Sequence, residues 1–314
     1  MEKQVCIIVP VKNTSSQFES CVSSISALNY SNLELIIVDD SKEAELKIPI
    51  DNSNNKIKIL YSRGKGPSYA RNLAAKNTDA YFLAFMDSDC IADKNLIHEL
   101  LRGFELYPDA AACGGIQGLP VDATNFEKQV FLFLQKAGFI TDYIKKSNKQ
   151  GIIRVVHNAS CCVVYKRSIF LEAGGFLEGL WPGEDVELDY RLCRKGYNLY
   201  FNPKAIVYHH RPKCLLGFLI MMYRYGISCG ILTRMYGIFR KIQSVPFLAL
   251  AAAVLLLLAF SFHFLSVFLI IAGAALCLLF IYVGLSVPVF FLACAAGIFW
   301  NLGFLKGLIK AIKK

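Results

Sequence analysis

The sequence predicts an α/β domain built on a parallel sheet, followed by helices that enter a membrane. Three observations support this prediction. In the N-terminal two thirds of the chain, short apolar runs rich in β-branched residues alternate with segments of helical period. No Asp or Glu follows Asp189, although 34 Lys and Arg are spread over the chain. After Val245 the sequence is almost continuously apolar.

The predicted strands end in polar clusters. Strands are expected at 5–9, 33–38, 57–61, 80–86, 157–165 and 205–208, and helices at 17–28, 67–76, 95–107 and from 184 onward. In open α/β sheets, ligands gather at the carboxyl ends of the strands. The first candidates for a site are therefore the residues at those ends: Pro10, Val11, Asp39, Asp40, Asp87, Ser88 and Asp89.

Charge changes sign along the chain. Residues 1–189 carry 20 Lys or Arg against 24 Asp or Glu, whereas residues 190–314 carry 14 Lys or Arg and no acid. A basic segment beside an apolar one fits the anionic cytoplasmic face of a membrane. Nucleic acid is the rival partner, but no base-reading motif accompanies the charge, and we expect no nucleic-acid binding.

The C-terminal third is expected to form a membrane anchor. Residues 213–245 mix apolar and basic side chains, which favours an interfacial helix. Residues 246–305 contain three charge-free stretches: 246–262, 264–285 and 287–305. The first two would make a single helix of about 60 Å, twice the hydrocarbon thickness of about 30 Å, so about three spans are expected. Three spans place the basic tail 306–314 outside, against the positive-inside bias.

The 11 cysteines are scattered and are expected to be small buried residues in a reducing compartment. The N-terminus opens into the strand-like run Val5–Val9 without a signal-peptide layout. We therefore expect a multi-pass protein of the cytoplasmic membrane, with its domain at 1–212 in the cytoplasm.

Asp87 and Asp89 leave a predicted buried strand one residue apart, so both carboxylates can reach a common point. Two carboxylates on an exposed turn form an oxygen-rich site for Mg²⁺ or Mn²⁺. Such a cation shares phosphate oxygens with a nucleoside diphosphate leaving group. Taken alone, the pair is more simply a turn rich in small acids, but further candidate residues favour a metal site.

Three of these residues suit a nucleotide or a metal. A carboxylate at Asp40 can accept a hydrogen bond from a nucleobase, and the Arg71 guanidinium can neutralise phosphate. Singly, they also fit an Asx-turn and a solvated helix residue. His209 follows a strand-like run, and its imidazole can supply a metal ligand, although a lone His is more often structural.

Glu184 and Asp185 stand at a predicted helix start. Acids are favoured there by the free N–H groups and the helix dipole, so capping is one explanation. The functional explanation makes Asp185 a general base that takes the proton of an acceptor hydroxyl, while Glu184 holds the acceptor or the geometry.

Six short motifs, in order, resemble those of the family 2 glycosyltransferases, which have the GT-A fold. They are Val9-Pro10-Val11-Lys12-Asn13, Val38-Asp39-Asp40-Ser41, Gly66-Pro67-Ser68-Tyr69-Ala70-Arg71-Asn72, Asp87-Ser88-Asp89, Gly183-Glu184-Asp185-Val186-Glu187-Leu188 and Tyr208-His209-His210. Each motif is weak alone, but six in the family's order are specific. The resemblance covers about residues 4–212.

The resemblance implies a nucleotide-sugar donor, with UDP expected on the family's base rate alone. Asp40 would read the base, Arg71 would contact the donor, and Pro10 and Val11 would lie in the same donor site. Asp87 would support the ribose or the metal.

The resemblance also implies a divalent cation, Mg²⁺ or Mn²⁺, coordinated by Asp89 with Asp87, and His209 as a possible third ligand. Asp185 would be the catalytic base of an inverting, single-displacement transfer.

One motif departs from the processive members of the family, which carry Gln-x-x-Arg-Trp before their membrane helices. The comparable segment here is Met221-Met222-Tyr223-Arg224-Tyr225-Gly226. The spans are also too few to enclose a polymer channel. The chain is therefore similar to membrane-bound members that add one sugar to a lipid-linked or surface-glycan precursor, as in bacterial exopolysaccharide assembly.

Three alternatives compete with this interpretation. A polyprenyl-phosphate sugar synthase has the same fold, but its phosphate acceptor is already ionised and needs no base at Asp185. A nucleotidyltransferase would need a glycine-rich basic loop near the first strand, which residues 9–13 do not provide. A channel subunit or scaffold that only binds nucleotide is disfavoured because Asp87, Asp89, Glu184 and Asp185 occur together.

Overall fold

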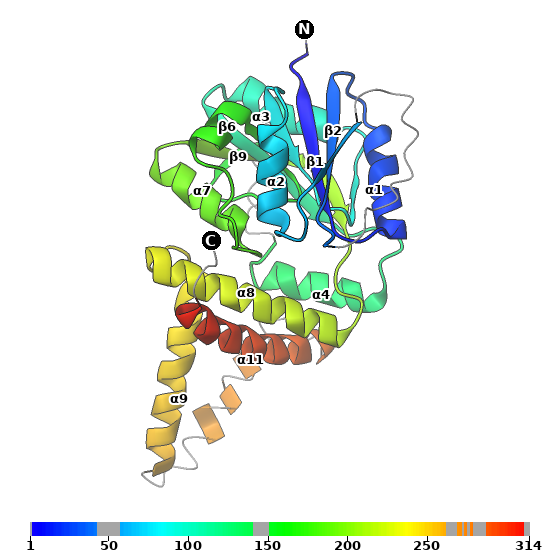
Figure 1. Ribbon diagram of the computed structural model, residues 1–314. Helices are drawn as coiled ribbons and strands as arrows, with labels where there is room; N and C mark the ends of the chain where they lie inside the picture. The colour runs from blue at the N-terminus through cyan, green and yellow to red at the C-terminus, as the bar shows by residue number, and fades with distance from the viewer. Residues whose placement is uncertain are drawn as a thin grey trace. The chain divides into compact units, whose positions relative to one another are not determined.

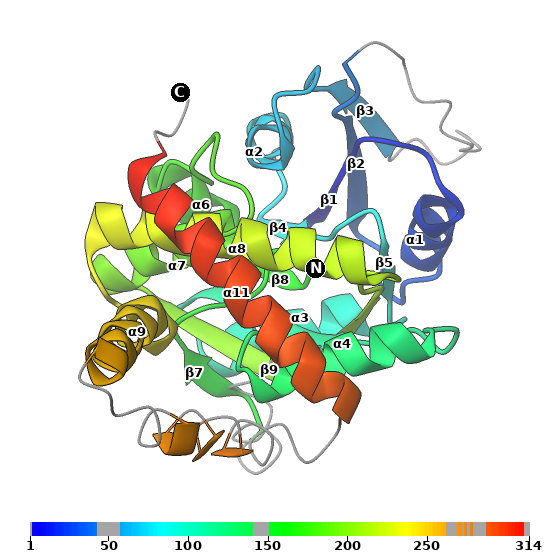
Figure 2. The same ribbon diagram turned by 90° about the horizontal axis from the view of Figure 1, so that it is seen from below.

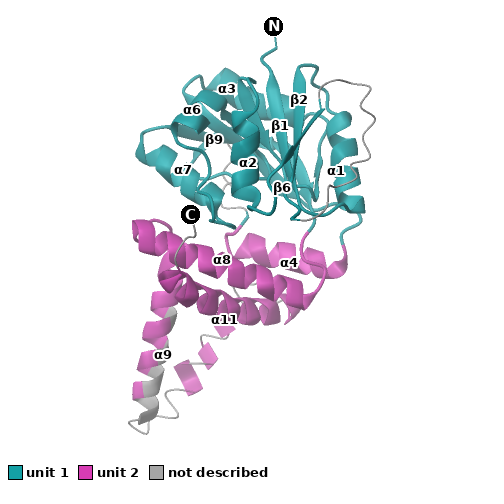
Figure 3. Ribbon diagram, in the orientation of Figure 1, with its two compact units in different colours: residues 1–123, 140–210, 312–314 teal, residues 124–139, 211–311 magenta. Residues whose placement is uncertain are grey.

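The computed structural model describes residues 2–42, 57–140, 151–261, 269–271, 273–274, 277–278 and 287–310. The chain separates into two compact units (Figure 3). Within the described residues, the first unit comprises Met1–Ala123 and Ile140–His210, and the second comprises Thr124–Phe139 and Arg211–Ala311. A short segment from the middle of the chain, Thr124–Phe139, thus belongs to the same unit as the C-terminal helices.

A single mixed sheet runs through the described part of the first unit (Figure 1). In chain order its strands are β1 (Val5–Val11), β2 (Leu33–Asp39), β3 (Ile57–Tyr61), β4 (Phe82–Phe85), β5 (Cys90–Ala92), β6 (Ala110–Gly118), β7 (Ile153–Val155), β8 (Val163–Lys166) and β9 (Asn198–His209). The spatial order is β3-β2-β1-β4-β8-β6-β9-β5, and β7 also pairs with β9. The first four strands are parallel, but β8 lies antiparallel to both β4 and β6. The α/β class is confirmed, and the expected parallel sheet holds for β1 to β4 but not for β8, so the sheet as a whole is mixed.

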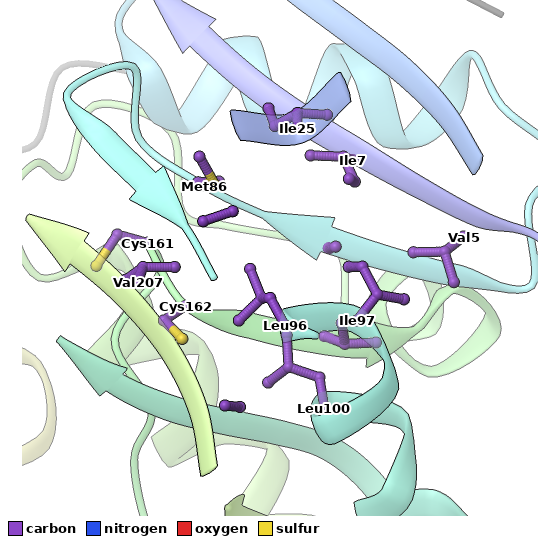
Figure 4. Close-up of a cluster of buried hydrophobic side chains, with 14 of the residues drawn as sticks. Val5, Ile7, Ile25, Met86, Leu96, Ile97, Leu100, Cys161, Cys162 and Val207 are labelled. Atoms are coloured by element: carbon purple, nitrogen blue, oxygen red, sulfur yellow. The ribbon is translucent and has the colours of Figure 1, made fainter. Parts of the chain in front are cut away.

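Helices cover both faces of this sheet. They are α1 (Ser16–Ser26), α2 (Pro67–Lys76), α3 (Leu96–Leu106), α6 (Arg167–Glu172) and α7 (Glu184–Arg194). Side chains alternate between the two faces of a strand, so Val5 and Ile7 of β1 pack with α1 and α3, while Cys6 and Ile8 pack with α2, α6 and α7. Figure 4 shows the first of these cores, with Ile7, Ile25 of α1 and Leu96 of α3.

Several strands differ from the predicted ones: β5 and β7 were not predicted, β9 begins at Asn198 instead of 205, and two further differences have a clear reason in the packing. β6 was not predicted, because its Ala and Gly residues are typical of a turn; a Cβ on Gly115 would lie 2.3 Å from the carbonyl oxygen of Ala205, so glycine is needed for packing against β9. The strand predicted at 157–165 begins only at Val163, because residues 157–160 form a loop hydrogen-bonded to α7.

The second unit consists of helices. They are α4 (Asn125–Lys136), α8 (Leu215–Tyr236), the 3-10 helix η1 (Lys241–Ser244), α9 (Val245–Ser261) and α11 (Val287–Ile309). A capping box begins α4, with Thr124 and Glu127 each binding the other's backbone N–H. The ring of Phe133 on α4 lies 5.6 Å from that of Phe218 on α8. Figure 2 shows α8 and α11 side by side, with α9 seen nearly end-on and so running across them.

Glycines allow α8 and α11 to pack at very close range. A Cβ on Gly226 would lie 2.0 Å from the carbonyl oxygen of Trp300, and one on Gly303 would lie 2.1 Å from that of Tyr223. Gly230 and Gly307 repeat both contacts one turn further along. Residue numbers rise together on both helices, so the helices are parallel. Each contributes a Gly-x-x-x-Gly pair, which we call the glycine seam.

Among the described helices, α8 with 22 residues and α11 with 23 are long and apolar enough to cross a membrane. The 17-residue α9 corresponds to the first predicted span, and α11 to the third. The second predicted span, 264–285, lies largely outside the described residues. The interfacial assignment of 213–245 and the domain boundary near Pro212 stay predictions.

Candidate active site

The carboxyl ends of β1 and β2 bring Pro10, Val11 and Asp40 together. In the parallel register, Pro10 pairs with Val38 and Val11 with Asp39. The backbone N–H of Asp40 then donates to the carbonyl oxygen of Val11 at 2.7 Å. Three of the predicted donor-site residues therefore lie at one edge of the sheet.

Asp40 is buried and hydrogen-bonded to the turn before α2. Its Oδ1 accepts from Ser62 Oγ at 2.6 Å, and both carboxylate oxygens accept from the Gly66 N–H at 3.1 Å. Gly66 has a φ of 92°, a conformation that favours glycine. Asp40 thus fixes the start of α2, the helix that carries Arg71, and its contact with a nucleobase stays a prediction.

Arg71 is buried between two carboxylates. Its Nη2 donates to Asp87 Oδ1 at 2.5 Å and its Nη1 to Glu184 Oε1 at 2.7 Å. Although burial opposes the charge, Asp87 and Glu184 together raise the pKa of Arg71 above its ordinary value. The side chain therefore joins the turn after β4 to the start of α7 as a permanent cation. Its partners lie 16 and 113 residues away, which the sequence does not reveal.

Glu184 is the buried member of the acidic pair at the start of α7. Burial raises the pKa of its carboxyl to about 7, with Arg71 opposing the rise and Asp185 adding to it. The preceding Gly183 has a φ of 100° and provides no side chain to cap the helix. Glu184 therefore contacts Arg71, and its role of holding the acceptor or the geometry stays a prediction.

Asp87, Asp89 and His209 form a cluster suited to a metal. One ligand atom from each lies within 4.8 Å of the others. Antiparallel pairing of β5 with β9 places Cys90 opposite His209 and so brings Asp89 beside the imidazole, with Asp89 Oδ1 3.2 Å from His209 Nε2. Two carboxylates and one imidazole suit Mn²⁺, and with water also Mg²⁺. The three predicted ligands therefore converge, and their chemistry fits a divalent cation.

Asp185 is partly exposed and held in place by backbone groups. Its Oδ2 accepts from the Ser160 N–H at 3.0 Å and its Oδ1 from the N–H of Val186 at 2.8 Å. Each oxygen keeps a further lone pair for another donor. The carboxylate is therefore oriented and able to accept a further hydrogen bond, although its contact with Val186 is also typical of an acid at a helix start, and its role as a base stays a prediction.

Asp189 was missed by the sequence analysis. It lies one turn after Asp185 and is completely buried. Its carboxylate accepts from Tyr165 Oη at 2.7 Å and the Asn158 N–H at 2.7 Å, and lies 3.1 Å from His157 Nδ1. Burial raises the pKa of Asp189. The sequence feature that indicates its burial is an acidic residue on the apolar side of a helix, beside Leu188 and Leu192. Asp185 and Asp189 together hold the 157–160 loop against α7.

Two cysteines adjoin the cluster of Asp87, Asp89 and His209. Cys90 and Cys161 are buried, and each lies with its Sγ within 4.8 Å of the other and of a His209 ring nitrogen. A hydrogen bond from Cys90 lowers the pKa of the Cys161 thiol to about 7 against the effect of burial, and His209 adds to the lowering. The prediction that these cysteines are buried is confirmed, but their meeting beside His209 was not foreseen.

Fold, strand-end acids and a metal-suited cluster define a glycosyltransferase with the GT-A architecture. The family model described as "Glycosyl transferase family 2" matches residues 6–174, and the chain belongs to that family.

Relatives of known activity support this assignment. A pre-mycofactocin glycosyltransferase of Mycobacterium tuberculosis is 28% identical over 232 residues, 73% of this chain and 47% of the relative. An O-antigen chain rhamnosyltransferase of Salmonella typhimurium is 27% identical, with 66% of each chain covered. A poly-beta-1,6-N-acetyl-D-glucosamine synthase of Staphylococcus aureus is 21% identical, covering 68% of this chain and 51% of the synthase. The chain spans about half to two thirds of the length of these relatives.

A solved structure shares the fold. It is a mannosyltransferase from Pyrobaculum calidifontis in complex with GDP-mannose and Mn²⁺, with a TM-score of 0.63 and 14% identity. The similarity covers 98% of this chain and 88% of that chain. The GT-A fold is thereby confirmed.

Proposed function

We propose that this chain transfers one sugar, with inversion, from a nucleoside diphosphate sugar to a hydroxyl of a lipid-linked or surface-glycan acceptor at the cytoplasmic face of the membrane. The observation that carries this proposal is the double ion pair of Arg71. It links Asp87, on the metal side, to Glu184, the neighbour of the candidate base. Donor and acceptor chemistry thus meet at one end of the sheet.

The donor half of the site would hold a divalent cation through Asp87, Asp89 and His209. When bound there, the cation supplies positive charge that stabilises the diphosphate leaving group. The Mn²⁺ and GDP-mannose in the mannosyltransferase structure support this assignment. Asp40, with Pro10 and Val11, forms the strand-end edge where the nucleotide would bind, and UDP remains the expected nucleotide. Arg71 fixes the Asp87 carboxylate and adds a buried positive charge to the donor side of the site. Its direct contact with the donor stays a prediction.

The acceptor half depends on Asp185. Its carboxylate would take the proton as the acceptor O–H bond breaks and the acceptor oxygen forms a bond to the anomeric carbon. On the opposite face, the bond from that carbon to the phosphate oxygen breaks, and its electron pair leaves on the diphosphate. Such a displacement inverts the anomeric centre. The backbone donors from Ser160 and Val186 keep the base oriented, and Asp189 holds the loop that supplies Ser160.

The helical unit would place this chemistry at a membrane surface. Arg224 lies near the middle of α8 and is exposed, and an Arg at a bilayer centre costs about 2.5–3.5 kcal/mol or more. This cost favours α8 in the interface. Because the glycine seam packs α11 parallel to α8, α11 would lie there too. Its exposed apolar side chains follow one side of the helix: Phe291, Ile298, Leu302, Leu305 and Ile309.

This arrangement leaves two crossings, α9 and the charge-free stretch 264–285, instead of three. An even number returns Lys306 and Lys310 to the cytoplasmic side, in agreement with the positive-inside bias. Two crossings within residues 246–310 would not by themselves enclose a polymer channel, and we therefore propose single-sugar transfer although one relative is a polymer synthase.

The replacement Asp185→Asn tests the proposed base. Asn keeps the shape and hydrogen bonding but does not take a proton at neutral pH, so transfer should fall by roughly 10²–10⁴ while Mn²⁺-dependent donor binding survives. The measurement is transfer to membrane-derived acceptor, with donor binding by calorimetry on the detergent-solubilised full chain.

Asp93→Asn is the matched control, because Asp93 is also a helix-start acid, hydrogen-bonded to the Asn95 N–H, but lies outside the site. It should transfer within a few-fold of wild type. If Asp185→Asn binds donor and transfers equally well, Asp185 is only a cap, and the polyprenyl-phosphate sugar synthase becomes the better hypothesis.

A further inference from the structure

A second set of potential ligands adjoins the Asp87–Asp89–His209 cluster. Cys90, Cys161 and His209 place one ligand atom each within 4.8 Å of the others. This set differs in chemistry from the first, because it offers two sulfur atoms and one imidazole nitrogen. Thiolate and imidazole are ligands of Zn²⁺ and similar thiophilic cations, whereas Mg²⁺ and Mn²⁺ favour oxygen.

The fold builds this cluster from three separate segments. Antiparallel pairing of β5 with β9 places Cys90 opposite His209. Cys161 directly follows the 157–160 loop that Asp185 and Asp189 hold against α7. Figure 4 shows Cys161 beside Val207, near the carboxyl end of β9. The two buried thiols therefore come from different segments and lie close to the partly buried His209.

Asp89 completes the set. Its Oδ1 lies 3.2 Å from His209 Nε2 and 4.0 Å from Cys90 Sγ. In a tetrahedral zinc site with Zn–S of about 2.3 Å and Zn–N of about 2.0 Å, neighbouring ligand atoms lie roughly 3.3–3.8 Å apart. The separations among Cys90, Cys161 and His209, and those of Asp89 from His209 and Cys90, are all at or below 4.8 Å and would reach that size with shifts of about 1 Å or less.

We propose that Cys90, Cys161, His209 and Asp89 form a binding site for a thiophilic divalent cation of the Zn²⁺ class. The site shares His209 and Asp89 with the proposed Mn²⁺ or Mg²⁺ site, so the two cations exclude one another. Occupancy by the thiophilic cation removes two of the three ligands of the other cation. Zn²⁺ is therefore an inhibitor that excess Mn²⁺ reverses poorly, since Mn²⁺ competes weakly for thiolates.

The site can be tested without any transferase activity. The detergent-solubilised full chain, kept reduced, is titrated with Co²⁺, whose thiolate complexes have strong charge-transfer absorption in the near ultraviolet and whose carboxylate complexes do not. The wild-type protein should give this absorption at one equivalent, and Zn²⁺ should abolish it. Cys90→Ala and Cys161→Ala each leave a single thiolate and should lose at least half of it, whereas Cys162→Ala, a buried neighbour outside the cluster, should retain it in full.

An absence of thiolate absorption in the wild-type protein overturns the proposal, and so does full absorption in Cys161→Ala. Inhibition adds a second readout, because Zn²⁺ at fixed Mn²⁺ should inhibit donor hydrolysis at least tenfold less effectively in Cys161→Ala than in Cys162→Ala. Equal inhibition of both variants contradicts the shared ligands. If the proposed transferase function failed, the Co²⁺ spectra would still report on this site.

Discussion

Replacing Arg71 by Met retains much of the side chain's volume and removes the charge that pairs with Asp87 and Glu184. The Asp87 side chain is 30% exposed and can be solvated, but the Glu184 side chain is only 3% exposed. Breaking a buried pair by removing one partner costs about 3–5 kcal/mol. Each kcal/mol lowers Tm by about 2–4 °C in a domain of this size, so Tm should fall by roughly 10 °C.

The deficit should also depend on pH. Burial raises the pKa of Glu184 to about 7, and loss of Arg71 removes the charge that opposes this rise. A carboxyl with a raised pKa contributes stability below its ordinary pKa and loses it as pH rises through the folded-state pKa. Arg71→Met should therefore be closer to wild type near pH 6 than near pH 8, where the variant lacks the cation that stabilises the ionised Glu184 carboxylate of the wild type.

Thermal unfolding of the detergent-solubilised full chain measures both effects. Arg167→Met is the control, because Arg167 pairs at 3.7 Å with a fully exposed Asp79 and its loss should cost below about 1 kcal/mol. Glu184→Gln in the Arg71→Met background should restore part of the lost stability. If Arg71→Met unfolds within 2 °C of Arg167→Met at both pH values, the buried ion-pair network does not stabilise the fold as described.

Three further predictions concern the metal, the glycine seam and the tail. Asp89→Ala should weaken Mn²⁺-dependent donor binding at least tenfold by calorimetry, and wild-type binding in that variant would exclude the site. Gly303→Ala should lower the free energy of unfolding by about 1–3 kcal/mol, whereas Gly297→Ala, with open space around its Cβ position, should not; equal thermal melts would contradict the seam. A protease site inserted after Lys310 should be cut in inverted membrane vesicles but not in right-side-out vesicles, and the reverse pattern would restore an odd number of crossings.

The candidate site residues at the strand ends could be predicted because hydrophobic periodicity, and the position of a residue directly after a strand, can be recognised without any tertiary contact. β1 and β4 are uniform apolar runs, so the residues after them, including Asp87 and Asp89, were assigned to one edge of a sheet before any pairing was known. The structure confirms that Asp87, Asp89 and His209 meet. Their role in binding a cation stays a prediction.

The missed features depend on contacts between distant segments. β6 consists largely of Ala and Gly because Asn158 and Ala205 pack directly against its backbone, a reason that local propensity does not contain. The buried partners of Arg71, and the meeting of Cys90 with Cys161, appear only once the strand order is fixed. The antiparallel direction of β8 could not be predicted either, since alternation and apolar content do not give the direction of a strand.

The assignment of α4 to the helical unit affects how this protein can be recombined. Chain segments pass between the two units near residues 123, 139 and 210, so no single cut separates them. An exchange of everything after Pro212 with another family member would pair the native α4 with foreign helices, removing the Phe133–Phe218 contact and the hydrogen bond from the Arg211 N–H to Glu127. A functional chimera must therefore carry α4 together with the C-terminal helices, and natural variation in these helices should be inherited as a two-part module.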